Sequence, residues 1–283
     1  LRHGLIPNLH DGGMNPRYNA RDATWWFLQA LQEYAIMSGE GGNVFNILVP
    51  RLFPTDNQIE FNRNWLHKKN RPIVTMGDIV FEILNKHANG IHFVEWNAGG
   101  QIDSVMTTDG FSIDIITDWS TGFIIGGNQF NCGTWMDKMG SSEKAGNKGH
   151  PATSRDGGDV EIIGLLESTL RWLNECSKNG TFTHDGVLVE ATQQKVTWED
   201  WSNLVCNNFE TWFYIPANPK QDKDYFIDEQ FVNLRGIYKD TIGSAKEFTD
   251  YQFRPNLVVA MTVAPELFDP VHAVRCLNLV EER

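Results

Sequence analysis

Apolar residues recur at helical spacing in several stretches of the chain. Within and just after residues 21–34, Leu28, Leu31 and Ala35 follow one another at steps of three and four, and Asp22 suits the first turn of a helix. The same criteria predict helices elsewhere in the chain. Together the expected helices cover residues 21–34, 75–87, 159–178, 197–214, 256–263 and 269 nearly to the last residue.

The pattern changes to short β-like runs between residues 91 and 127. Asp109-Gly110 and the segment 120–122 have the composition of turns between such runs. We expect a small antiparallel sheet that leads directly into a glycine-rich stretch, residues 126–140. The predicted strands cover residues 91–96, 111–117 and 122–125.

Long loops are expected between these elements, because glycine, proline and polar residues dominate much of the remaining sequence. A short hairpin at 187–193 precedes a capping box at 197–200, where the next helix begins. No βαβ alternation, internal repeat or clear linker is present. The simplest fold class is therefore all-α, one α-rich domain over residues 1–283, with a small β insertion and functional residues on the loops.

The glycine-rich stretch 126–140 contains one acid, Asp137, among large apolar side chains, with Trp135 two residues before it. Enclosure by a tryptophan raises the pKa of a carboxyl group, because desolvation disfavours its charged form. We therefore interpret Asp137 as a general acid for breaking a glycosidic bond. The alternative is a loop aspartate that caps the next turn.

Charge and composition narrow the class of partner. The chain has a net charge of -12 and scattered basic residues, which argues against nucleic acid and anionic membranes as partners. No apolar run is long enough to span a bilayer, and no signal peptide is recognisable. The four cysteines are far apart, which is typical of reduced thiols in the cytoplasm. Ten tryptophans are compatible with a sugar polymer as partner.

The common catalytic and phosphate-binding motifs are absent from the sequence, and no two histidines are spaced i, i+4. We therefore expect neither a metal site nor a cofactor. A nucleophilic pair of Cys132 and His150 is an alternative. Carboxylates on loops among aromatic residues are what a glycosidase needs. These carboxylates are Asp22, Asp137, Asp156, Glu161 and Asp240.

These segments resemble the C-terminal glucosidase domain of eukaryotic glycogen debranching enzymes. The similarity extends, in order, over nearly the whole chain, and the glycine-rich stretch with Gly133-Thr134-Trp135-Met136-Asp137 is its most specific part. The matching segments are 3–8, 17–23, 97–103, 126–140, 155–157 with 160–162, 235–240 and 251–268.

The resemblance implies an (α/α)6 barrel, in which two concentric rings of helices leave loops at one end to build the pocket. The β insertion near 91–127 would lie at that end. The implied activity is amylo-α-1,6-glucosidase, which removes the single α-1,6-linked glucose at a trimmed glycogen branch with inversion. The implied partners are a branched α-glucan and an N-terminal 4-α-glucanotransferase part of the same polypeptide.

By this resemblance Asp137 is the general acid, and a group of polar and aromatic residues contacts the sugar. Arg21 and Asp22 would bind hydroxyl groups, and Tyr18, Trp25 and Trp135 would form apolar walls. The alternative for each is structural capping or pairing. The remaining candidates are Asn131, Arg254 and Asn256 as further polar groups of the pocket, with Asp156, Glu161 and Asp240 as secondary candidates.

One departure from the family concerns the general base. The family carries it as a Glu in a segment reading His-Gln-Gly-Pro-Glu-Trp, which this chain lacks, and Glu266 belongs to a different family segment. We therefore expect a domain truncated at both ends that is inactive alone and exposes apolar surface. Two alternatives remain open: a glycan-binding module without catalysis, and another helical-barrel glycosidase with a different substrate.

Overall fold

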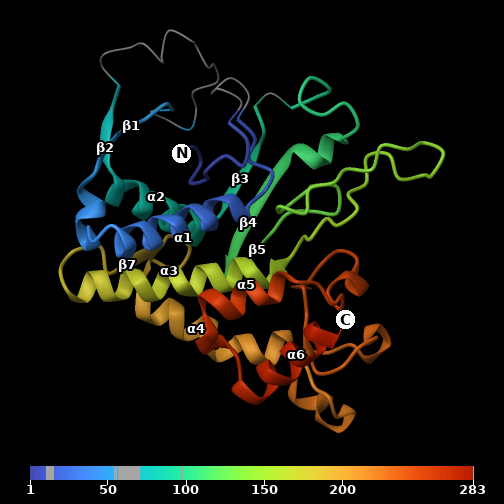
Figure 1. The fold of residues 1–283 in the computed structure, drawn as a ribbon. Coiled ribbons are helices and arrows are strands. Elements are labelled where there is room, and N and C mark those ends of the chain that lie inside the picture. The colour runs from blue at the N-terminus through green and yellow to red at the C-terminus, as the bar shows by residue number, and fades with distance from the viewer. Residues whose placement is uncertain (11–15, 54–55, 57–70, 97, 283) are drawn as a thin grey trace.

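The protein is helix-rich. The computed structural model describes residues 1–10, 16–53, 56, 71–96 and 98–282. Within them every predicted helix is confirmed to within a few residues, because periodicity and end signals are local properties of the sequence (Figure 1). The α-helices are α1 (Asp22–Met37), α2 (Met76–Asn89), α3 (Val160–Lys178), α4 (Trp198–Phe213), α5 (Asn256–Val263) and α6 (Pro270–Glu282).

Helices α1 and α3 lie side by side and run in the same direction (Figure 1). At their start, Arg21 forms an ion pair with Asp159, which immediately precedes α3. Further along both helices, the Ser168 hydroxyl donates a hydrogen bond to the Gln29 side chain at 2.8 Å. Early residues of α1 thus lie near the start of α3 and later residues of α1 near later residues of α3, so the two helices are parallel.

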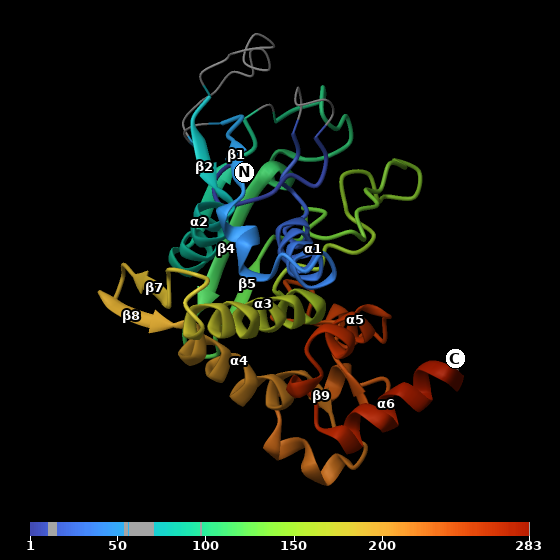
Figure 2. The same cartoon turned by 60° about the vertical axis from the view of Figure 1, so that its left-hand side comes forward.

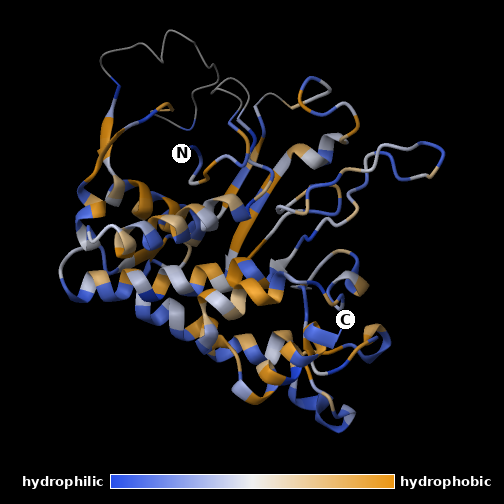
Figure 3. Ribbon diagram, in the orientation of Figure 1, coloured by the Kyte–Doolittle hydropathy of each residue, from blue (hydrophilic) through white to orange (hydrophobic). Residues whose placement is uncertain are grey.

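Helix α5 continues this parallel arrangement on the other side of α3. Gly164, in the second turn of α3, lies against Ala260 of α5. Further along α3, the Arg171 guanidinium donates to the backbone oxygen of Val263, the last residue of α5, at 2.9 Å. The short α5 is apolar over most of its length, as a helix packed on several neighbours should be (Figure 3). Three helix N-termini thus meet at one end of this helix layer.

Helix α4 packs antiparallel to α3 (Figure 2). The Lys178 ammonium at the end of α3 lies 3.0 Å from the Glu199 carboxylate at the start of α4, and the Ser202 hydroxyl donates to Glu167 at 2.7 Å. The predicted capping box of α4 is confirmed, with Thr197 as its N-cap.

The predicted three-stranded antiparallel sheet is also confirmed. It consists of β3 (Ile91–Val94), β4 (Ser112–Asp118) and β5 (Phe123–Gly126), with β4 in the middle. Ile113 and Ile115 of β4 point into the core, so the alternate residues lie on the opposite face. The sheet leads directly into the glycine-rich stretch, as expected.

The all-α fold class was too narrow. Four further antiparallel pairs of short strands occur among the described residues. The helices of the described residues do not close a barrel. One pair, residues 186–189 with 194–197, confirms to within a few residues the hairpin expected at 187–193. The other strands have only two or three residues, too few for a period-two pattern, and they form by backbone pairing between more distant segments. The pairs are β1 (Leu48–Pro50) with β2 (Ile73–Thr75), β6 (Gly158–Asp159) with β11 (Thr241–Ile242), β7 (Gly186–Val189) with β8 (Gln194–Thr197), and β9 (Tyr214–Ile215) with β10 (Ile237–Tyr238).

The part of the chain that the structure describes contains no helix both long and apolar enough to cross a membrane.

Candidate functional site

Charged residues gather where α1, α3 and α5 begin. Asp22 and Glu161 lie in the first turns of α1 and α3, Asp159 is the N-cap of α3, and Asn256 is the first residue of α5. All four are buried. Carboxylates are favoured at helix N-termini, where the helix dipole is positive. We call the full set the charged centre: Arg21, Asp22, Arg155, Asp159, Glu161, Asp240, Arg254 and Asn256.

Arg155 connects the charged centre. Its guanidinium is fully buried and forms bidentate pairs with Glu161 and with Asp240, at 3.0 and 3.2 Å in the second pair. It also donates to the Thr134 hydroxyl at 3.3 Å. Burial opposes its charge, but Asp159 and Glu161 outweigh burial and raise the pKa of Arg155 well above its usual value. Arg155 was missed as a functional residue, although it stands in a segment that resembles the family.

Asp240 brings two of the predicted pocket residues together. Besides Arg155, its carboxylate accepts hydrogen bonds from Arg254 Nη1 and from Asn256 Nδ2, each at 2.7 Å. Asn256 is buried, whereas the Arg254 side chain is partly exposed. The three candidates Asp240, Arg254 and Asn256 therefore form one hydrogen-bonded group, with Arg254 nearest to solvent.

Arg21 is engaged with the protein itself. Its guanidinium pairs with Asp159 and donates to the backbone oxygens of Arg155 and Gly157, at 2.7 and 3.1 Å. Burial raises the pKa of Asp159, and the neighbouring Arg21 and Arg155 guanidinium groups oppose this change. These contacts correspond to the structural-pairing alternative for Arg21.

Two glycines of the stretch 126–140 lie directly against the Arg21 guanidinium. A Cβ atom at Gly127 would lie 2.4 Å from Arg21 Nη1, and one at Gly133 would lie 2.3 Å from it. Both distances are far below a normal contact, so a side chain at either position would displace the Arg21 guanidinium. Gly127 also has a φ of 78°, which favours glycine.

The same stretch is hydrogen-bonded to the start of α1 at three points. The backbone N–H of Arg21 donates to the oxygen of Gly133 at 3.0 Å, and Asn19 Nδ2 donates to the oxygen of Cys132 at 2.9 Å. The N–H of Trp135 donates to Asp22 Oδ2 at 2.9 Å. Burial raises the pKa of Asp22, while this hydrogen bond opposes the change. Asp22 thus anchors the backbone just before Asp137.

The side chains that follow this anchor are exposed. Trp135 is 55% exposed, and Asp137 is exposed as well. The apolar enclosure that the sequence predicted for Asp137 is therefore wrong, because Trp135 turns to solvent instead of covering the carboxylate. No helix or strand contains residues 131–138, so hydrogen bonds hold this segment, including those that the Met136 and Lys138 oxygens accept from the Thr153 hydroxyl and the Ala152 N–H, each at 3.0 Å.

Two predicted sugar contacts are structural in this fold. Trp25 is completely buried and packs edge-on against His87, so it is a core residue and no wall of an open site. Asn131 is buried, and its Nδ2 donates to the backbone oxygen of Gly110 at 2.7 Å. Tyr18 is buried too, but it lines a cavity of about 290 Å³ together with Phe93. Its burial raises its pKa.

The nucleophilic alternative is not supported. Cys132 is buried, and burial raises the pKa of its thiol to about 11, which suppresses the reactive thiolate. His150 is exposed, and its ring packs on Phe130 with 5.7 Å between ring centroids. Among the described residues, no group of three or more potential ligands is arranged to hold a metal ion.

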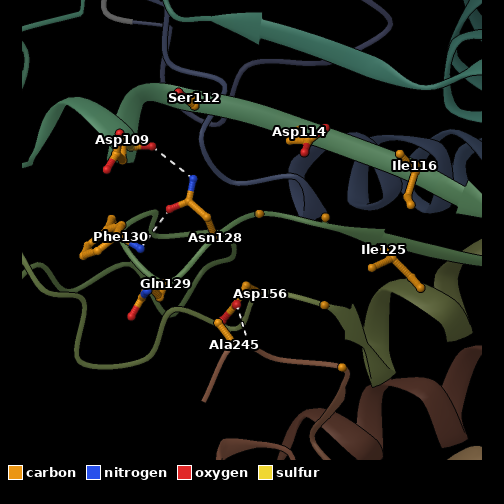
Figure 4. A pocket seen from close by; sticks show the side chains of 14 residues that line it. Asp109, Ser112, Asp114, Ile116, Ile125, Asn128, Gln129, Phe130, Asp156 and Ala245 are labelled. Carbon is orange, nitrogen blue, oxygen red and sulfur yellow. Dashed lines mark hydrogen bonds between the residues drawn. The ribbon is translucent and has the colours of Figure 1, made fainter. Parts of the chain in front are cut away.

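Figure 4 shows a larger cavity of about 580 Å³. It lies beside the charged centre, because Gly127 and Gly157 in its lining contact Arg21. Strands β4 and β5, the segment 128–130, and residues near Asp156 and Ala245 surround it. Asp156 is the only one of the predicted site residues that lines this cavity. Its carboxylate accepts hydrogen bonds from the Ser154 hydroxyl at 2.9 Å and from the Ala245 N–H at 2.8 Å.

The fold and site thus define a helix-rich domain with a buried centre of carboxylates and guanidinium groups and an exposed acid on an adjoining loop. Comparison with known families agrees with this description. The family model for amylo-alpha-1,6-glucosidase matches residues 1–283, and the chain belongs to this family.

A relative from Saccharomyces cerevisiae, glycogen debranching enzyme, is 48% identical over 288 aligned positions. The alignment covers 100% of this chain and 18% of that protein. The chain therefore spans less than a fifth of the length of the curated relative it matches.

Proposed function

We propose that this chain is part of an amylo-α-1,6-glucosidase, which hydrolyses the α-1,6-linked glucose at trimmed branch points of glycogen. The observation that carries the proposal is the match of the glucosidase family to residues 1–283. We further propose a longer enzyme that also carries a 4-α-glucanotransferase, as expected for a debranching enzyme. The free cysteines favour a reducing compartment, and we place the enzyme in the cytoplasm.

In this proposal Asp137 is the general acid that protonates the leaving oxygen. Its exposure supports the role, because a branch point of a large polymer must reach the acid. The hydrogen bonds of Trp135 and Gly133 would hold the backbone before it in place. An inverting reaction needs a second carboxylate about 6.5–9.5 Å away as the base. We assign the base to the glutamate that the family carries in another segment.

The charged centre would bind the glucose that is released. Arg254, which the Asp240 carboxylate orients on the solvent side, is the candidate for contact with its hydroxyl groups, whereas the buried Asn256 would hold Asp240 from within. Arg155 and Glu161 would keep Asp240 in place from within the protein. Trp135 presents an exposed ring on which a sugar can stack.

We also propose that α1, α3 and α5 are neighbouring inner helices of an (α/α)6 barrel. Their parallel direction and common N-terminal end support this arrangement. Helix α6 exposes Val271 and Val274, which suits a face that packs against further helices. A structure of the natural polypeptide in which α1, α3 and α5 were not consecutive members of one ring would contradict the proposal.

The decisive experiment measures glucose release from phosphorylase-limit dextrin by the chain within its natural polypeptide. Asp137→Asn keeps the shape but removes the proton, so we expect a loss of about 10²–10⁴-fold in kcat, with glycan binding retained. Glu143→Gln is the matched control, because Glu143 is an exposed acid of the following loop and should not affect turnover.

Near-normal turnover of Asp137→Asn would refute the acid assignment. Glycan binding by the unmodified protein without any glucose release would instead support a binding module. Release of glucose from other linkages only would indicate a different glycosidase.

A further inference from the structure

The floor of the 580 Å³ cavity is the outer face of the sheet β4–β5 (Figure 4). Ser112, Asp114 and Ile116 alternate along β4 and therefore share this face. Ile116 is paired across the strands with Ile125 of β5, and both line the cavity. The floor thus combines an apolar strip with a hydroxyl group and a carboxylate.

One wall is the segment 128–130, held in place by its own hydrogen bonds. Asn128 Nδ2 donates to the backbone oxygen of Asp109 at 3.0 Å, and Asn128 Oδ1 accepts from the N–H of Phe130 at 2.9 Å (Figure 4). The side chains of Gln129 and Phe130 line the cavity from this wall. Within the described part of the chain, no protein partner binds the Gln129 amide, so it remains available to a ligand.

A second wall is formed by residues near Asp156 and Ala245. The hydrogen bond between the Ala245 N–H and the Asp156 carboxylate joins two segments that are 89 positions apart. Burial and two hydrogen bonds keep this carboxylate in one position. The small side chain of Ala245 and the adjacent Gly243 leave the space between the walls open.

The lining excludes some ligands and favours one class. It contains Asp109, Asp114 and Asp156 but no lysine, arginine or histidine. Although Asp114 pairs with His92, and Arg21 lies behind Gly127, the lining offers no cationic side chain to a phosphate or other anion. Carboxylates, an amide and a hydroxyl group accept and donate hydrogen bonds around the apolar strip and the Phe130 ring. A neutral sugar has the matching character, with C–H groups on its ring face and hydroxyl groups around its rim.

We propose that this cavity binds a short stretch of neutral α-glucan, as a second carbohydrate site beside the one that contains Asp137. The proposal rests on the function proposed above for the substrate class. Neither Asp137 nor Trp135 lines the cavity. Gly127 lines the cavity and packs on Arg21 of the charged centre, so the cavity and the charged centre are neighbours. The site would hold a neighbouring part of the polymer while the branch point is cleaved.

The test fills the cavity without removing a hydrogen bond. Ala245→Trp projects an indole into the space while keeping the backbone N–H that binds Asp156, and Glu247→Trp is the matched control on an exposed position outside the lining. Gln129→Ala is a second variant that removes the free amide without adding bulk. All are made in the natural polypeptide, with maltopentaose as the probe.

We expect maltopentaose to slow hydrogen exchange in residues 112–116 and 125–130 of the unmodified protein, and this protection to be lost in Ala245→Trp. The KM for limit dextrin should rise at least tenfold in Ala245→Trp and severalfold in Gln129→Ala. Their kcat and their hydrolysis of the small substrate α-glucosyl fluoride should be unchanged. Glu247→Trp should behave like the unmodified protein.

The proposal would be overturned if maltopentaose affected hydrogen exchange equally in the unmodified protein and in both cavity variants, and if both variants kept the unmodified KM for limit dextrin. A parallel loss of α-glucosyl fluoride hydrolysis would also overturn it, since the cavity would then belong to the catalytic pocket. The two proposals fail separately: if the unmodified protein released no glucose but Ala245→Trp still removed the protection by maltopentaose, the second site would stand and the glucosidase function would not.

Discussion

At the scale of single residues, Arg155 is the side chain on which the charged centre depends. It is buried together with Asp159, Glu161 and Asp240, each of which lies within ion-pair distance of its guanidinium. Removing one partner of a buried ion pair leaves the other charges without compensation, which is more costly than losing an exposed pair.

We therefore expect Arg155→Met to lower the free energy of unfolding by about 3–5 kcal/mol, as measured by urea denaturation. Lys148→Met is the control, because the pair of Lys148 with Glu143 is exposed and should contribute about 1 kcal/mol or less. Equal stabilities of the two variants would show that the charged centre adjusts to the loss of Arg155.

Glu167 gives the protein a pH dependence that one substitution can remove. Its side chain is buried between α3 and α4, where it accepts a hydrogen bond from Ser202, and burial raises its pKa from 4.5 to about 7. The folded state therefore binds more protons than the unfolded state between these two values. Its contribution to stability is complete below pH 4.5 and is lost as the pH rises through 7.

Glu167→Gln should flatten the dependence of unfolding free energy on pH between about 4.5 and 7, relative to the unmodified protein. The exposed Glu175 lies on the same helix, and Glu175→Gln is the control. If the difference between Glu167→Gln and the unmodified protein stayed constant over this range, Glu167 would not be the group that titrates.

At the scale of elements, the parallel layer of α1, α3 and α5 depends on close contact between helices. A Cβ atom at Gly164 of α3 would lie 2.6 Å from the Cα and 2.7 Å from the Cβ of Ala260 in α5. Alanine is ordinarily favoured over glycine inside a helix by about 1 kcal/mol. Here the contact leaves no room for it.

We expect Gly164→Ala to destabilise the protein by about 1–3 kcal/mol, because overpacking outweighs the gain in helix propensity. Thermal or urea unfolding would measure it. The double variant Gly164→Ala with Ala260→Gly should recover part of the loss at most, since it removes the Cβ of Ala260 but leaves its Cα, which also collides. A stabilised Gly164→Ala would mean that α3 and α5 separate easily, and the parallel layer would then be loose.

At the scale of the whole molecule, burial keeps the thiols unreactive. Cys132, Cys176 and Cys276 are buried and all four cysteines are free. Burial raises the pKa of Cys132, Cys206 and Cys276 to about 11. Few thiolates therefore form at neutral pH.

A thiol reagent at pH 8 should accordingly modify the four thiols of this chain slowly in the folded state and fully after denaturation. Mass spectrometry of the peptides from this chain would count them. A reducing agent should leave the melting temperature unchanged. A melting temperature that fell on reduction would indicate a disulfide in the native protein.

The sequence by itself determined the helices, the three-stranded sheet, the capping box at Thr197 and the family. These depend on signals within a few residues of one another or on motifs in a fixed order. It also identified Asp240, Arg254 and Asn256 as polar candidates without relating them to one another. The assignment of Asp137 as the general acid is likewise a prediction from the sequence.

Only the tertiary structure decided which of these residues meet. Asp22 anchors Trp135 from 113 positions away, and Arg155 binds Asp240 from 85 positions away. No local pattern encodes such pairs, because they arise where helix ends and loops converge. Packing between segments that are distant in the sequence also decides that Trp25 lies in the core and that Asp137 is exposed. Burial is a property of the packed chain, whereas helix propensity is a property of its neighbouring residues.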